Sequence, residues 1–127
     1  MWTLICDVDV SGAENDSLSD LMFKWTSELD AVAEKETLFR NARVSGSADT
    51  GWVRFRLDSD APTFEFTHAI NRCLSAIRGV LHADEVGTPG WPDERDAPDG
   101  VWPVLGFVRD IQVEFQTNHR DPAVVSA

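Results

Sequence analysis

The apolar residues of this chain recur with two different periods, which divide it into segments in the order strand, helix, hairpin, helix, strand. Residues Trp2 to Val10 alternate between two faces, which predicts a half-buried strand. Residues 18–34 carry apolar side chains at spacings of four and three, which predicts a helix. This stripe consists of Leu18, Met22, Trp25, Leu29 and Val32. The order of segments constrains the fold because few topologies bury one face of every element without crossing connections.

The first helix has signals at its start and along its polar side. Ser17, with Asp20 three residues later, predicts a capping box in which the hydroxyl accepts a bond from the backbone of the first turn. Asp16, Asp20, Lys24 and Glu28 follow one another at four-residue spacing. We therefore expect Lys24 to bridge the acids above and below it.

The middle of the chain predicts a β-hairpin. Its strands are expected over 37–45 and 52–59, with the glycine-bounded segment 46–51 as the connecting loop. The second strand alternates regularly, so one set of its side chains should face away from the core. That outward set is Trp52, Arg54 and Arg56.

A second helix is predicted to begin at Pro62, with an apolar stripe that repeats the spacing of the first. Arg followed by Gly at 78–79 is a common helix ending, so we expect the helix to stop there. Residues 80–86 are then predicted to form a fourth strand. The alternative is a helix that continues to His82. A last alternating segment, 107–115, predicts a fifth strand.

These elements favour an α+β fold of ferredoxin-like order. We expect a two-layer sandwich in which an antiparallel sheet carries two helices on one face and gains an extra carboxy-terminal strand. Residues 1–116 are predicted to form a single domain. Residues 87–100 should form a long acidic loop rich in proline and glycine, and residues 117–127 a flexible tail.

The charge of the chain narrows the kinds of partner it can have. Aspartate and glutamate number 22 against 11 lysines and arginines, a formal net charge of -11. A field of this sign repels nucleic acid and anionic membranes and favours basic partners. No stretch is long and apolar enough for a membrane span, and Cys6 and Cys73 are expected to be free buried thiols rather than a disulfide. The chain is therefore predicted to be cytoplasmic, with a basic protein as its partner.

The acidic residues concentrate in two segments. Residues 9–36 hold eight acids against two lysines, and residues 84–99 hold six against one arginine. Tryptophan is common at binding hot spots, so the tryptophan in the second segment is a candidate contact unless its ring folds back onto the domain. The predicted partner-binding residues are Asp16, Asp20, Glu28, Trp91, Asp93 and Glu94. The alternative is that these acids only keep the protein soluble.

The sheet face away from the helices is a second candidate surface. Its predicted members are Ile5, Phe39, Trp52, Arg54 and Arg56. Rings beside guanidiniums are the kind of surface on which single-stranded nucleic acids stack, but the net charge opposes that use. Exposed aromatic faces and unpaired edge strands are usually covered, so self-association through the sheet is expected.

No motif for catalysis or cofactor binding is present. Asp7 and Asp9 lie two residues apart on one strand face, but two carboxylates are too few for a metal site. We therefore predict no catalytic, metal-binding or cofactor-binding residues. The favoured function is a non-catalytic protein-interaction or assembly module. The alternatives are an acidic mimic of nucleic acid that inhibits a DNA-binding protein, and an enzyme or sensor whose small-ligand pocket forms at a dimeric sheet face.

Overall fold

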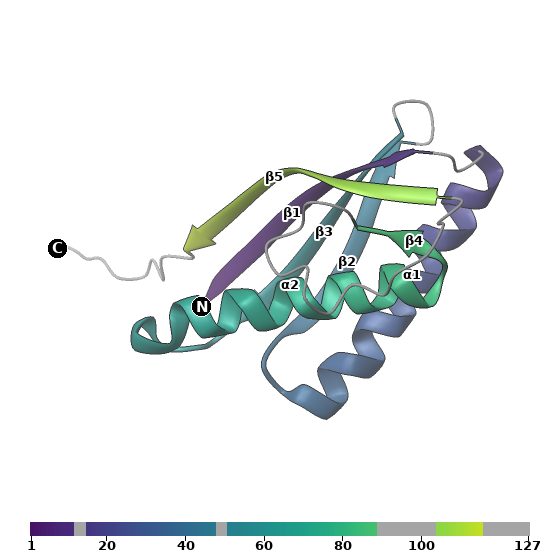
Figure 1. The fold of residues 1–127 in the computed structure, drawn as a ribbon. Helices are drawn as coiled ribbons and strands as arrows, with labels where there is room; N and C mark the ends of the chain where they lie inside the picture. Colours follow the sequence, from purple (N-terminus) through teal and green to yellow (C-terminus); the bar gives the residue numbers. More distant parts are fainter. Residues whose placement is uncertain (12–14, 48–50, 89–103, 116–127) are drawn as a thin grey trace, which may run out of the picture.

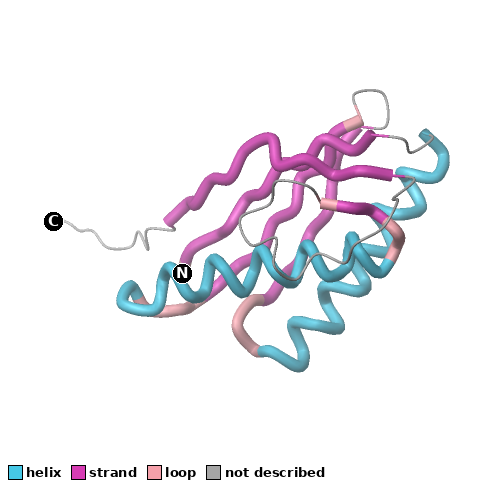
Figure 2. The backbone as a smooth tube through the Cα atoms, viewed as in Figure 1, coloured by secondary structure: helices cyan, strands magenta, loops and turns pink. Residues whose placement is uncertain are grey.

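The computed structural model describes residues 1–11, 15–47, 51–88 and 104–115. The strands are β1 (Trp2–Ser11), β2 (Arg40–Ser47), β3 (Trp52–Ser59), β4 (Val86–Gly87) and β5 (Val104–Phe115). The helices are α1 (Asn15–Glu36) and α2 (Phe66–Ala83), and a short 3-10 turn (Thr63–Glu65) precedes α2. Both helices lie on the same face of the sheet (Figures 1 and 2).

The sheet is mixed and curls strongly into a half-barrel, with the strand order β2-β3-β1-β5-β4. Its three long pairings are antiparallel, whereas β4 runs parallel to β5. The predicted antiparallel ferredoxin-like sandwich is therefore wrong. A parallel neighbour requires a long crossover connection, and residues 88–103 between β4 and β5 are long enough to provide one.

The predicted fourth strand over 80–86 is also wrong, because α2 continues through Gly79 to Ala83. The alternative, a helix reaching His82, is confirmed. The buried stripe of α2 extends at helical spacing from Cys73 through Ile77 to Leu81, and its burial holds the chain in the helix. Only Val86 and Gly87 form the short strand that follows.

The first strand of the hairpin begins three residues later than predicted. A register irregularity between Arg40 and Arg43 interrupts the pairing of β2 with β3, and Asn41 has a positive φ of 54°. The irregularity inserts one residue and so reverses which side chains face the core. Phe39, predicted on the outer sheet face, instead lies in the core with 4% of its surface exposed.

The start of α1 differs from the prediction as well. The helix begins at Asn15, so Ser17 lies inside it rather than at its N-cap, and the predicted capping box is wrong. Lys24 does not primarily bridge its own helix. Its ammonium donates to the Asp84 carboxylate just after α2, at 2.5 Å.

The core fills the space between the sheet and the two helices. The predicted apolar stripe of α1 is confirmed, with Leu18, Trp25 and Leu29 buried in one core cluster with the inner side chains of the sheet. Cys6 and Cys73 are free and buried, as predicted. The predicted fifth strand is present and begins earlier, at Val104. Apart from Gly87 and Thr88, the predicted acidic loop lies outside the described residues, as does the predicted tail.

Candidate functional site

The outer face of the sheet, which the helices do not cover, carries an internally bonded polar network. The Arg54 guanidinium donates two bonds to the Asp7 carboxylate, at 2.8 and 3.0 Å. Asp58 accepts bonds from Thr3 Oγ1 at 2.6 Å, Asn41 Nδ2 at 3.1 Å and Arg43 Nη2 at 3.0 Å. The carboxylates of this network are therefore already bonded to donors from neighbouring strands.

The protonation of Asp58 reflects these bonds. Burial by itself disfavours the charged carboxylate, but the hydrogen bonds from Thr3 and Asn41 and the charges of Arg43 and Arg40 outweigh it and lower the pKa of Asp58. An ionised carboxylate that is fully bonded within the protein is poorly suited to act as a general base or to capture a ligand. Its evident role is structural.

Trp52, the aromatic residue predicted on the outer face, is flanked by the protein's own charged side chains. The guanidiniums of Arg54 and Arg109 lie 5.7 and 5.3 Å from the centre of the Trp52 ring, within cation–π range. Ile5 is only 3% exposed. Arg56 is half-buried, and its Nε has no hydrogen-bond partner. Four of the five predicted sheet-face residues thus share this surface, but Trp52 is not an open platform for stacking.

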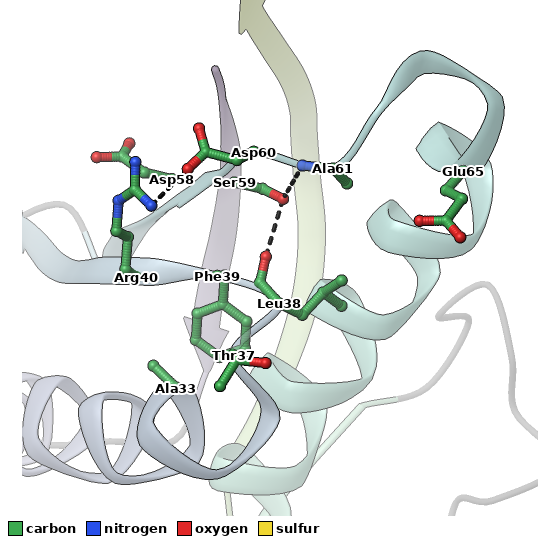
Figure 3. Close-up of a pocket in the computed structure, with 10 residues that line it drawn as sticks. All are labelled: Ala33, Thr37, Leu38, Phe39, Arg40, Asp58, Ser59, Asp60, Ala61 and Glu65. Atoms are coloured by element: carbon green, nitrogen blue, oxygen red, sulfur yellow. Dashed lines mark hydrogen bonds and ion pairs between the residues drawn. The ribbon is translucent and has the colours of Figure 1, made fainter.

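A pocket of about 420 Å³ lies where β2 begins and β3 ends (Figure 3). Its apolar wall includes Leu38 and Phe39. Ser59 Oγ donates to the Leu38 carbonyl at 2.9 Å and accepts from the Ala61 amide at 3.1 Å. Arg40 forms an ion pair with Asp60 at the rim. Since these polar groups are bonded to one another, they offer few free contacts to a ligand.

A groove of about 370 Å³ runs between α1 and α2. The two helices are antiparallel, because Lys24 bonds to Asp84 near one end and Arg72 pairs with Glu36 near the other. Short side chains and one acid line the groove: Glu28, Ala31, Val32, Ala76, Gly79, Val80 and Ala83. A Cβ atom placed on Gly79 would have no atom within 4 Å other than the nearby backbone of its own helix, so the groove is open at that point.

Glu28, the one acid that lines this groove, lies beside a second carboxyl group, that of Asp84. Glu28 is half-buried and lies within hydrogen-bonding reach of Asp84, whose side chain is only 4% exposed. Carboxyl groups can bond to each other only when one of them holds a proton. When both are ionised, the buried oxygens Glu28 Oε1 and Asp84 Oδ2 have no donor.

The surroundings of Glu28 favour its protonated form. Burial, followed by the hydrogen bond to Asp84 and its negative charge, raises the pKa of Glu28, while Lys24 acts in the opposite direction. The positive charge of Lys24 therefore offsets only part of the effects that raise the pKa of Glu28.

The predicted partner-binding residues are only partly brought together. Asp20 is exposed on α1, and Glu28 lies at the groove rather than on a fully wet face. Asp16 lies in the first turn of α1, and its side chain is outside the described part of the structure. Trp91, Asp93 and Glu94 also lie outside the described residues.

The sequence prediction missed the groove. The sequence does contain an indication of the groove: the second helix has small residues at positions 76, 79 and 83, at spacings of three and four. That spacing places small side chains on one helix face, where another chain can approach closely. Asp84 was missed as well, since only the antiparallel packing of the helices brings it to Glu28.

Comparisons with known proteins identify no relative of this chain. The sequence matches no protein-family model, and neither curated proteins nor solved structures contain a match.

Proposed function

We propose that this protein is a non-catalytic interaction module that binds a basic segment of a partner protein in the groove between α1 and α2. One observation carries the proposal: an open groove lined by short side chains holds a single acid, Glu28, whose carboxyl group lies beside that of Asp84. A lysine or arginine of the partner would pair with the Glu28 carboxyl group and bring positive charge to the two acids. The apolar side chains next to it would enter the groove, in the helix-in-groove mode of peptide recognition.

The overall charge supports the same kind of partner. The net charge of -11 would attract a basic segment and speed its association at low salt. In contrast, the polar groups of the outer sheet face and of the pocket at the β2 start are bonded within the protein. A small-ligand site at the sheet face would use Asp7, Arg54 and Arg56. None of these residues lines the pocket at the start of β2 or the groove between α1 and α2.

The observations give less support to a nucleic-acid mimic. Mimicry needs rows of free carboxylates on one face, whereas described acids lie both on α1 and on the outer sheet face. There, Asp7 and Asp58 are paired with arginines. Neither α1 nor α2 has an apolar stretch long enough to span a bilayer. Cys6 and Cys73 are free and buried, and free cysteines are typical of proteins in a reducing compartment. This supports the cytoplasm as the location that we propose.

Filling the groove tests the proposal. Gly79→Leu adds a side chain in open space and also removes a helix-interior glycine, so the fold should be retained. Asn71→Leu is the matched control, an exposed position on the same helix that does not line the groove. Each variant would be used to capture proteins from an extract of the native cell, followed by mass spectrometry. We expect Asn71→Leu to retain the partners of the wild type and Gly79→Leu to lose them.

The carboxyl pair is tested separately with Glu28→Gln. The amide can donate to Asp84 as a protonated Glu28 does, so the fold should be stable, but the glutamine cannot ionise to pair with a cation of the partner. Capture by this variant should be weaker and less sensitive to salt than capture by the wild type. If the same partners bind Gly79→Leu and Glu28→Gln as well as they bind the wild type, the groove is not the binding site.

A further inference from the structure

No described strand pairs with most of the outer edge of β5. Among the described residues, β4 covers β5 only at Val104 and Leu105, while β1 pairs with its other edge as far as Phe115. The backbone groups of residues 107–115 on the outer side therefore have no strand partner in the described part of the chain. An uncovered edge of this kind can pair with another strand.

The opposite edge of the sheet, formed by β2, is better protected against such pairing. Its register is interrupted between Arg40 and Arg43, and Asn41 adopts a positive φ there. Irregular pairing and charged side chains both discourage the addition of a strand. Any pairing through an edge is therefore more favourable at β5.

The side of β5 that faces the helices is apolar and incompletely covered. We call Val108, Ile111, Val113 and Phe115 the β5 apolar row. The first three are half-buried, and Phe115 is 64% exposed. Its ring stacks on that of Phe66, with 5.5 Å between the ring centres. A chain added at this edge would remove part of the row from water, which favours association.

We propose that a second copy of this chain pairs with β5 in antiparallel orientation about a two-fold axis at Val113. In this arrangement Val113 lies opposite itself, Ile111 lies opposite Phe115 of the other copy, and Gln112 lies opposite Glu114 of the other copy. Residues opposite each other in such a pair share a face, so the apolar row of one copy extends that of the other.

Other centres for the two-fold axis are less favourable. A centre at Gln112 places Asp110 opposite Glu114, and a centre at Glu114 places that residue opposite itself. Like charges directly opposite each other destabilise a pair of strands. A centre at Ile111 includes the irregular register near Val108, where the alternation of faces breaks. Val113 is the position that combines apolar contacts with no like-charged pair.

The net charge of the chain opposes this pairing and gives it a distinctive salt dependence. Two copies each carrying -11 repel each other, and dissolved ions screen that repulsion. Self-association should therefore strengthen as salt is added. The binding of a basic partner in the α1–α2 groove should weaken under the same change, so the two proposals can fail independently.

The test is site-directed cross-linking. In the proposed register the two Val113 Cα atoms lie about 5 Å apart, close enough for a disulfide. Asp110→Cys serves as the control, because its two copies would lie about 20 Å apart along the strands. The native thiols do not interfere, since burial raises the pKa of Cys6 and of Cys73 to about 12. We expect Val113→Cys to form covalent dimers roughly tenfold faster than Asp110→Cys under mild oxidation.

A second experiment fixes the register. Mixing Gln112→Cys with Glu114→Cys should produce the crossed dimer faster than either variant links to itself. Ultracentrifugation of the wild type should show a dimer whose fraction rises with protein and salt concentration. A wild type that stays monomeric at high protein concentration and high salt would overturn the proposal. Equal cross-linking rates for Val113→Cys and Asp110→Cys would also overturn it.

Discussion

Replacing Asp58 with asparagine should destabilise the protein far more than its size suggests. The side chain is 8% exposed and accepts three hydrogen bonds, one of them from the Arg43 guanidinium. Asparagine keeps one acceptor oxygen but turns its amide protons toward groups that are themselves donors. A bond to a charged group contributes about 1.5–3 kcal/mol, and bonds within one network do not add fully. We expect the free energy of unfolding to fall by about 3 kcal/mol near neutral pH.

The effect of pH separates this cause from a general loss of packing. The folded-state pKa of Asp58 is lowered, so its carboxylate stabilises the fold above the unfolded pKa. That contribution is lost as the pH falls toward and through the folded pKa. Asparagine does not titrate at this position. The difference in unfolding free energy between the wild type and Asp58→Asn should therefore shrink between about pH 7 and about pH 3.

The measurement is urea unfolding followed by tryptophan fluorescence at several pH values. Asp60→Asn is the control, because Asp60 is 54% exposed and its partner Arg40 is 55% exposed. That change should alter the stability by no more than about 0.5 kcal/mol. The reasoning is refuted if the two variants cost the same, or if the cost of Asp58→Asn does not change with pH.

Two further predictions concern glycines and thiols. Gly79→Ala should raise the free energy of unfolding by about 0.5–1 kcal/mol, since alanine has a higher helix propensity and its Cβ meets no clash. Gly46→Ala should lower the free energy of unfolding, because its Cβ would lie 2.4 Å from the Trp52 carbonyl oxygen. Thermal melts of the two variants compare them directly, and equal shifts would contradict the steric argument. Cys6 and Cys73 should not react with a thiol reagent until the protein unfolds, because burial raises the pKa of each thiol. Labelling of the native protein at the rate of labelling in urea would show that these thiols are accessible.

Periodicity predicted the elements in which one face is clearly apolar. The alternation of β1 and of β3 and the helical stripe of α1 are each determined by burial along one segment, so a local pattern was sufficient. The end of α2 was harder to predict. Val80 and Leu81 fit both a strand and a helix, and the glycine before them costs only about 1 kcal/mol inside a helix. Tertiary packing of Leu81 decides between the two possibilities.

The features that the sequence could not predict depend on contacts between distant segments. The parallel pairing of β4 with β5 involves a strand of two residues, which leaves no periodic signal. The irregular register near Arg40 moved Phe39 to the core without a glycine or proline to indicate it. The carboxyl pair of Glu28 and Asp84 forms only because two helices pack side by side.

The hydrogen-bonded carboxylate in β3 also has a consequence for how the strands find their alignment during folding. A slip of β3 by two residues along β1 would leave the apolar side chains on the core face, so the hydrophobic pattern alone would tolerate it. One such slip would even set Arg56 opposite Asp7, and an ion pair would survive. It would also move Asp58 away from Thr3 and set it opposite Ile5, where an ionised carboxylate loses a donor. This one residue therefore raises the free energy of misaligned sheets that burial and charge pairing would otherwise accept.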